Sequence, residues 1–350
     1  MRSLPGLVLA ALVAVPAYFA GRAAPTIGGP VFAIALGALV GLVPRSAAFG
    51  PGLRLASKKG LQAAVAMLGF GMNFVEALRI GGGSLAVMAA TVSAAFLCAL
   101  AVSRVLRVRG KAPALIAIGT AICGASAIAA AAPAMEADDE DTAYAIATIF
   151  VFNIAAVIVF PAAGRLLGMS DYGFGVWAGT AVNDTSSVVA AGLAFSRAAL
   201  ETATVVKLTR TLLIIPIVLI LVARTARLRA AGSASAGSVS QGSASGGSAD
   251  SGGAGASGAT GAVRSAFPWF VLWFVAASAS SSLGLVPAPV ATGLAGGGRA
   301  LILVAMAGIG LGVKPSAFAA AGWRPLVLGL ACWVSVAVSS LLAQAALERW

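Results

Sequence analysis

The chain is dominated by apolar runs that are long enough to cross a lipid bilayer as helices. A transmembrane α-helix needs about 20 predominantly apolar residues, and short clusters of basic residues separate the runs. This pattern predicts an all-α polytopic membrane protein with about nine to eleven transmembrane segments. The predicted segments are 5–21, 27–43, 59–76, 83–103, 113–135, 142–163, 172–195, 202–223, 266–284, 295–313 and 322–345.

Two of these segments, 113–135 and 172–195, are interrupted by glycines and polar residues. They contain similar stretches, GTAICGASAIAAA (119–131) and GTAVNDTSSVVAA (179–191). If both segments cross the membrane, the two stretches run parallel, and if both re-enter they are inverted. We favour the inverted, re-entrant form, because it aims two half-helix ends at one central point.

A second internal repeat pairs VAMLGFGMNF (65–74) with VAMAGIGLGV (304–313). An odd number of crossings separates these stretches, which predicts an inverted relation. Paired repeats with interrupted helices are typical of secondary transporters.

Residues 229–263 are rich in Gly, Ser and Ala and offer nothing to bury, which predicts a flexible cytoplasmic linker. The linker joins residues 1–228, which hold both interrupted segments, to residues 264–350, which hold the last three helices of the same membrane domain. The run 5–21 follows a basic start that also fits a signal peptide. We favour a first transmembrane helix, because many more segments follow.

Charge and composition narrow the class of protein further. Hydrophobic residues make up 60% of the 350 residues and charged residues only 10%, against about 25% charged in soluble domains. The net charge of +12 falls in clusters between apolar runs, which indicates cytoplasmic loops and an N-terminus in the cytoplasm, not a nucleic-acid partner. The basic residues that fix this orientation are Arg45, Arg54, Lys58, Lys59, Arg104, Arg107, Arg109, Lys111, Arg224, Arg227, Arg229 and Arg264.

Several chemistries are excluded or disfavoured. The chain has no histidine, and its three cysteines are far apart, so no metal site or disulfide framework is predicted. No nucleotide-binding G-x-x-x-x-G-K-[ST] motif is present, and no Ser or Cys has an evident base beside it. We therefore expect neither an enzyme nor a cofactor, apart from H⁺ or Na⁺ as a coupling ion.

The polar residues of the interrupted segments predict a binding site near the middle of the bilayer. Non-helical backbone at that depth must be buried in protein or face a wet cavity. Glycine permits the turn, hydroxyl and amide side chains cap the following half-helix, and its N-terminus favours an anion. The substrate-binding residues predicted on this basis are Gly119, Thr120, Cys123, Gly124, Ser126, Asn183, Thr185, Ser186 and Ser187.

Three ionisable residues fall well inside predicted segments: Asp184, Lys207 and Arg210. Charged groups at such depth are costly and mark functional sites. Lys207 and Arg210 are three residues apart and share a helix face, so they add charge to the predicted anion site, with Asp184 as the ion-coupling residue. In the alternative, Asp184 forms a structural ion pair with one of the two cations. Asn73 and Asn153 either line the same cavity or pack between helices.

Together, GTAICGASAIAA, AVNDTSSVVAAG and TVVKLTR resemble the YeiH-type family of conserved bacterial inner-membrane proteins, over about residues 27–345. The family is similar in design to transporters with crossed broken helices, which include bile-acid and sodium/proton carriers. The resemblance implies export of sulfate or a related sulfur anion.

The sequence therefore predicts a secondary active transporter of a small anion in the bacterial cytoplasmic membrane. Its partners are the anion, the lipid bilayer and, as an open alternative, a second copy in a homodimer. Two other functions remain open. One is a cation/proton antiporter that uses Asp184 as ligand and Lys207 as its competitor, and the other is a membrane protein without transport activity.

Overall fold

A computed structural model describes residues 3–24, 29–43, 46–108, 110–214, 216–217, 219–221, 223, 269–312 and 323–347. Their secondary structure is entirely helical, which confirms the predicted all-α class. The elements are α1 (Leu4–Ala23), α2 (Gly29–Gly41), η1 (Ala47–Phe49), α3 (Gly50–Arg54), η2 (Leu55–Gly60), α4 (Leu61–Leu68), η3 (Gly69–Gly71), α5 (Phe74–Gly83), α6 (Leu85–Leu106), α7 (Ala112–Ala121), α8 (Ala125–Ala134), α9 (Asp139–Leu166), α10 (Asp171–Ala181), α11 (Thr185–Phe195), α12 (Arg197–Thr211), α15 (Trp269–Ser282), α16 (Ala288–Leu311) and α18 (Trp323–Ala346).

In the part of the chain that the structure describes, five helices are long and apolar enough to cross a membrane: α1, α6, α9, α16 and α18. A sixth candidate combines the stretch Gly50–Gly71 with α5, between which the chain bends by 111°. These helices confirm a polytopic membrane protein. The predicted segment 59–76 is corrected, because its helical stretch begins at Gly50 and ends at this bend.

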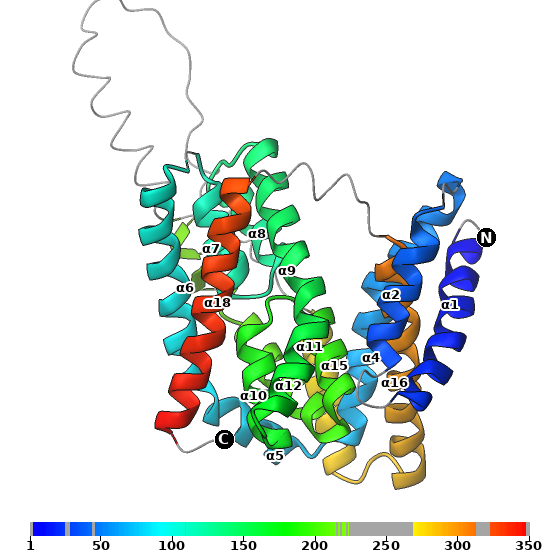
Figure 1. Cartoon of the computed structure of the whole chain (residues 1–350). Coiled ribbons are helices and arrows are strands. Elements are labelled where there is room, and N and C mark those ends of the chain that lie inside the picture. The colour runs from blue at the N-terminus through cyan, green and yellow to red at the C-terminus, as the bar shows by residue number, and fades with distance from the viewer. Residues whose placement is uncertain are drawn as a thin grey trace, which may run out of the picture.

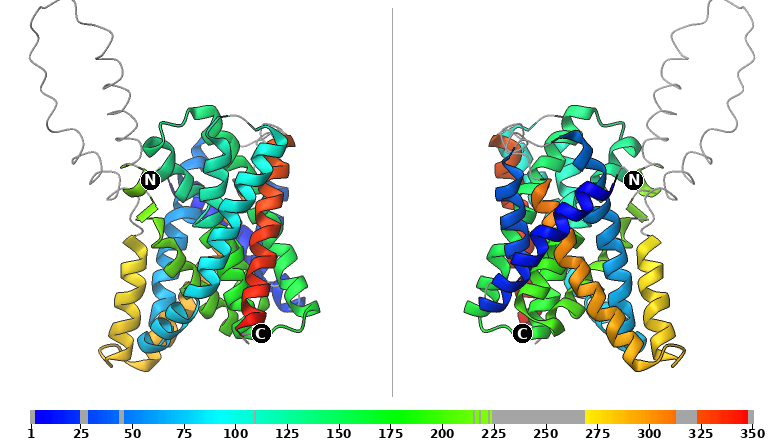
Figure 2. Two further views of the ribbon diagram at one scale, coloured as in Figure 1. Left: turned by 90° about the vertical axis from the view of Figure 1, so that its left-hand side faces the viewer. Right: turned by 90° about the vertical axis from the view of Figure 1, so that its right-hand side faces the viewer.

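The helices form two units that lie side by side (Figure 1). The hairpin unit consists of α6 to α12 with α18, and the flanking unit consists of α1 to α4 with α15 and α16. Distant segments meet within each unit: α18 packs along α6, and α16 packs along α2 and α1 (Figure 2). The units touch where α11 contacts α2 and α16. The predicted linker, 229–263, lies outside the described residues.

The second sequence repeat pairs antiparallel helices, as predicted. In the middle of α16, a Cβ on Gly298 would lie 2.9 Å from the carbonyl oxygen of Ala64, whereas Gly308 near its end faces Leu53 and Ala56. A glycine of the repeat also allows close helix packing, because Gly310 lies against Gly37 of α2, with Cβ-to-Cα separations of 3.0–3.1 Å. Gly308 and Gly310 thus allow α16 to pack closely against its neighbours in the flanking unit.

Candidate functional site

The segment 112–134 forms a hairpin of α7 and α8. Both ends of the segment lie at the same face, because Lys111 just before α7 contacts residues just after α8. Its backbone N–H donates to Asp141 Oδ2 at 2.6 Å, and its Nζ donates to the carbonyl oxygen of Glu136 at 2.6 Å. The chain therefore enters and leaves the hairpin unit on one side.

The segment 171–195 forms a second hairpin of α10 and α11. Phe174 near the start of α10 stacks on Phe195 at the end of α11, with ring centroids 3.9 Å apart and planes within 5°. Because these rings close the base of the segment, α10 and α11 also enter and leave on one side.

The two hairpins enter from opposite ends of α9 and meet halfway. Asp141, at the base of the first hairpin, lies near the start of α9, and Arg165 near its end donates to the carbonyl oxygen of Ala194 in the second at 2.6 Å. At the tips, a Cβ on Gly124 would lie 3.4 Å from Asp184 Cβ and 3.6 Å from Asn153 Nδ2. Asn153 is the middle of α9, whose 28 residues span about 42 Å. The two hairpins are thus oppositely directed, which is the arrangement that the inverted form of the first repeat predicts.

Local sequence explains the break at each tip. Gly124 has φ +69° and ψ −135°, a backbone conformation that residues other than glycine rarely adopt. At the other tip, Asp184 is the N-cap of α11, where its Oδ2 accepts the backbone N–H of Ser186 at 2.9 Å and also the Ser186 hydroxyl. The α11 N-terminus is therefore capped by a carboxylate, whereas the N-cap of α8 is Gly124, which has no side chain to cap the helix.

Lys207 and Arg210 lie beneath the tips on α12 and are 0% exposed. Lys207 Nζ donates to the carbonyl oxygens of Ile122 and Val182, each at 2.8 Å. Arg210 donates through Nε to the Ala121 carbonyl at 2.6 Å and through Nη2 to that of Thr120 at 3.2 Å. These carbonyls end α7 and α10, where helix dipoles favour cations.

This placement differs from the sequence prediction for the two cations. Neither Lys207 nor Arg210 lines the cavities described next. Among the described contacts, Asp184 and Lys207 form no direct ion pair, because each side chain is bonded to backbone instead.

Two adjoining cavities of about 420 and 190 Å³ lie between the hairpin tips and the flanking unit, and we call them together the tip cavity. Both are lined by Ala125, Asp184, Ser186 and Ile309. The larger part also reaches Ser57, Lys58, Gln62, Ser126 and Thr185, and the smaller part reaches Ile34, Asn153, Ser187 and Met306.

The tip cavity offers hydrogen-bond groups that the protein leaves unused. Asn153 is only 7% exposed, yet its Oδ1 has no partner within the described structure. Ala125 and Ser126, the first residues of the uncapped α8, line the same cavity. Since the first N–H groups of a helix lack partners within it, a ligand here meets backbone donors and one free amide oxygen, which accepts a hydrogen bond.

The other predicted residues do not line the tip cavity. Gly119 allows α7 to pack against Ile128 of α8, Thr120 and Cys123 are buried, and Asn183 is 1% exposed with both amide atoms unpartnered. Asn73 is corrected: it is exposed and caps α5, accepting from Val75 N at 2.9 Å, and it does not line the tip cavity.

Sequence reasoning missed the side of the cavity that the flanking unit supplies. Ser57 and Lys58 belong to η2, a π-helical turn, and such turns are frequent at functional sites. The sequence showed Lys58 only as one of several basic loop residues, so no signal separated it from its neighbours.

The helices and their two hairpins define a polytopic α-helical membrane protein, with a cavity that carries polar groups between the hairpin tips and the flanking unit. Residues 5–329 match the family described as Conserved hypothetical protein 698. The chain is 38% identical to a UPF0324 membrane protein of Streptococcus pyogenes, over 100% of this chain and 99% of the relative. It is 37% identical to one of Streptococcus agalactiae (99% and 98%) and 34% identical to one of Fusobacterium nucleatum (97% and 96%).

The chain therefore belongs to this family, and the resemblance to the YeiH type is confirmed. No solved structure matches it.

Proposed function

We propose that the protein is a secondary active transporter that carries a small anion across the bacterial cytoplasmic membrane. The observation that carries this proposal is the meeting of two oppositely directed hairpin tips at the tip cavity, halfway along α9. In secondary transporters, inverted repeats place interrupted helices around a substrate site near the bilayer midplane.

The donors around the tip cavity support an anionic substrate. The uncapped N-terminus of α8 presents backbone N–H groups, and helix N-termini favour anions. Lys58 adds a positive charge from the flanking unit, and Lys207 and Arg210 lie behind the tips. Within the anions, we propose sulfate or an organosulfonate, exported from the cytoplasm, because this is what the family resemblance implies.

Asp184 supports coupling to H⁺ or Na⁺. Its carboxylate lines both parts of the tip cavity while it caps α11. Neutralising this carboxylate, by a proton or a sodium ion, removes a negative charge beside the anion and changes the hydrogen bonds at the tip. Substrate binding and ion binding therefore favour one another at this point.

One observation favours a cation/proton antiporter as the second candidate. Lys207 Nζ bridges two backbone carbonyls from the ends of two half-helices, and such carbonyls also coordinate cations in transporters. In an antiporter, a cation would compete with the Lys207 ammonium for these oxygens.

Flux measurements in proteoliposomes test the proposal. Labelled sulfate and taurine are loaded under imposed pH or sodium gradients, with wild type beside Asn153→Ser and the matched control Asn73→Ser, which keeps a capping side chain outside the tip cavity. We expect gradient-driven anion flux that falls about tenfold or more in Asn153→Ser, because the shorter serine side chain cannot replace an N–H group donated by the Asn153 amide, and a hydrogen bond to a charged group contributes about 1.5–3 kcal/mol. Asn73→Ser should keep wild-type flux.

Asp184→Asn separates the two candidates. For the anion carrier, it should leave anion exchange but abolish its acceleration by the ion gradient. Sodium-driven pH change without anion flux, lost in Asp184→Asn, would establish the antiporter. Absence of both fluxes, with all variants behaving alike, would contradict transport and favour a membrane protein without transport activity.

A further inference from the structure

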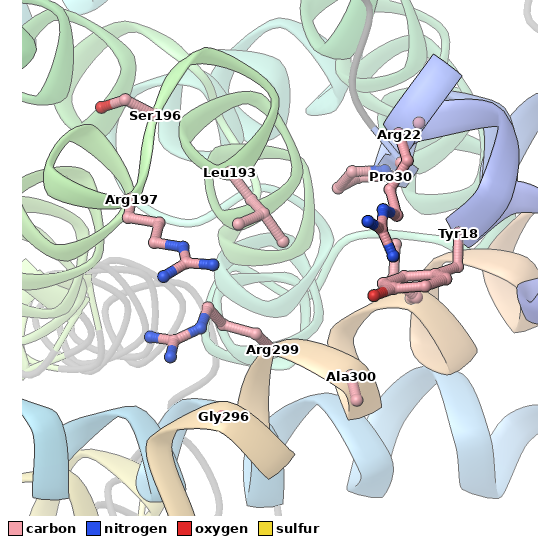
Figure 3. Close-up of a pocket in the computed structure, with 12 residues that line it drawn as sticks. Tyr18, Arg22, Pro30, Leu193, Ser196, Arg197, Gly296, Arg299 and Ala300 are labelled. Atoms are coloured by element: carbon pink, nitrogen blue, oxygen red, sulfur yellow. The ribbon is translucent and has the colours of Figure 1, made fainter. Parts of the chain in front are cut away.

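A second cavity, of about 850 Å³, opens between the two units and is lined by three arginines. We call it the arginine cavity. Arg22 comes from α1, Arg197 from the start of α12 and Arg299 from α16. Figure 3 shows the Arg197 and Arg299 side chains reaching toward the same space, with Arg22 and Tyr18 across from them.

The positive charge of this cavity is only partly balanced. No acidic residue is among the residues that line it. Glu201, one turn after Arg197, interacts electrostatically with Arg299, and Arg22 lies 5.9 Å from the centre of the Tyr18 ring. The sequence between Ala24 and Gly29 also contains no acidic residue. Like charges held together repel, so an excess of cations here favours a bound anion.

The arginine cavity and the tip cavity share one seam between the units. The same three helices, α2, α11 and α16, line both. The arginine cavity is lined by Pro30 of α2, Leu193 of α11 and Leu303 of α16. The tip cavity is lined by Ile34, Ser187 and Met306 of the same three helices. At 1.5 Å per residue the two residues on each helix are separated by about 4–9 Å along its axis. The two cavities thus lie one behind the other.

We propose that the arginine cavity is a binding site for an oxyanion, such as a sulfate, sulfonate or phosphate group. Guanidinium groups match the geometry of such groups through paired hydrogen bonds, and three of them from separate helices surround one space. We further assign the cavity as the mouth through which the anion enters or leaves the tip cavity. This second assignment rests on the proposed function, whereas anion binding does not.

A thiol introduced by Ala300→Cys, an exposed position in the arginine cavity, reports on this site alone. The full chain is placed in nanodiscs of zwitterionic phosphatidylcholine and labelled with anionic sulfonatoethyl or cationic trimethylammonioethyl methanethiosulfonate. The unmodified chain, whose Cys123 and Cys332 are buried and Cys98 half-buried, gives the background. We expect the anionic reagent to react about tenfold faster relative to the cationic one, because clustered charge concentrates counter-ions.

The ratio of the anionic to the cationic labelling rate should fall strongly in Arg197→Gln/Arg299→Gln. It should stay unchanged in Arg104→Gln, because Arg104 is an exposed residue at the end of α6. Sulfate should slow the anionic reagent more than chloride does at equal ionic strength. Equal rates for both reagents, or a ratio that the double variant leaves unchanged, would overturn the proposal.

A parallel experiment with phosphatidylglycerol in the nanodiscs distinguishes a free anion from a lipid headgroup. Protection by free sulfate supports the site and its assignment as a mouth. Protection by phosphatidylglycerol alone keeps the oxyanion site but overturns the mouth. Sulfate protection in a protein without anion flux would remove the proposed function and leave the binding site standing.

Discussion

Lys207 and Arg210 bond to the carbonyl ends of helices that stop inside the protein. At membrane depth, an unsatisfied backbone carbonyl costs several kcal/mol. A single ammonium on Lys207 joins Ile122 of the first hairpin to Val182 of the second. One side chain of α12 therefore helps to fix the relative position of the two tips.

Lys207→Met should lower the stability of the protein strongly. The thioether cannot donate, so two buried carbonyls lose their partner at about 1–3 kcal/mol each. Melting of the purified protein in detergent, followed by tryptophan fluorescence, measures this loss. The matched control is Lys58→Met, since Lys58 is exposed and its removal should leave the melting temperature nearly unchanged. Equal shifts for the two variants would contradict a structural role for Lys207.

The sequence predicted some residues of the tip cavity and misplaced others, for a physical reason. Hydroxyl and acidic groups at membrane depth need polar surroundings, so Asp184 and Ser126 could be assigned to a cavity that both line. The spacing of Lys207 and Arg210 shows that they share a helix face but not what that face meets. Here it meets carbonyls, which the sequence cannot reveal.

The two hairpins are the elements that define the site. Their arms contain 10 residues in α7 and α8 and 11 in α10 and α11, so each arm is about 15–17 Å long. This is about half of a 30 Å hydrocarbon layer, and tips entering from opposite faces therefore meet at its middle. The total length of each segment also fits one full crossing, and only the contacts at the hairpin bases decide between the two forms.

Gly124→Ala should destabilise the first hairpin. Gly124 combines φ +69° with ψ −135°, where a side chain costs about 1–3 kcal/mol, and the new methyl would also approach Asp184 Cβ at 3.4 Å. Gly293→Ala in α16 is the control, because a Cβ there meets nothing within 4 Å and alanine favours a helix. In thermal melting, Gly124→Ala should lower the melting temperature and Gly293→Ala should raise it slightly. A Gly124→Ala protein as stable as the control would rule out a strained break at this tip.

The two structural units of the molecule do not correspond to two continuous parts of the sequence. Helices α15 and α16, from the last part of the chain, join α1 to α4 in the flanking unit, while α18 joins α6 in the hairpin unit. Such pairings between distant segments depend on tertiary contacts that local hydropathy does not encode. Helix type, the antiparallel repeat and the interrupted segments were predictable from the sequence, but the seam that carries both cavities was not.

A covalent bridge across the seam tests whether transport needs movement between the units. Gln62 on α4 and Ala129 on α8 line the tip cavity from opposite units, so Gln62→Cys/Ala129→Cys can be joined by a short bis-maleimide. Alternating access requires one unit to move against the other around the site. We therefore expect anion flux in proteoliposomes to fall to the level of protein-free vesicles after cross-linking.

Each single-cysteine variant treated with the same reagent controls for simple obstruction of the tip cavity and should keep part of its flux. Mass spectrometry measures the cross-linked fraction. Full cross-linking with undiminished flux would mean that the anion passes without relative motion of the units. The two cavities would then form a continuous channel along α2, α11 and α16, and the secondary-transporter mechanism would be wrong even if the anion site is right.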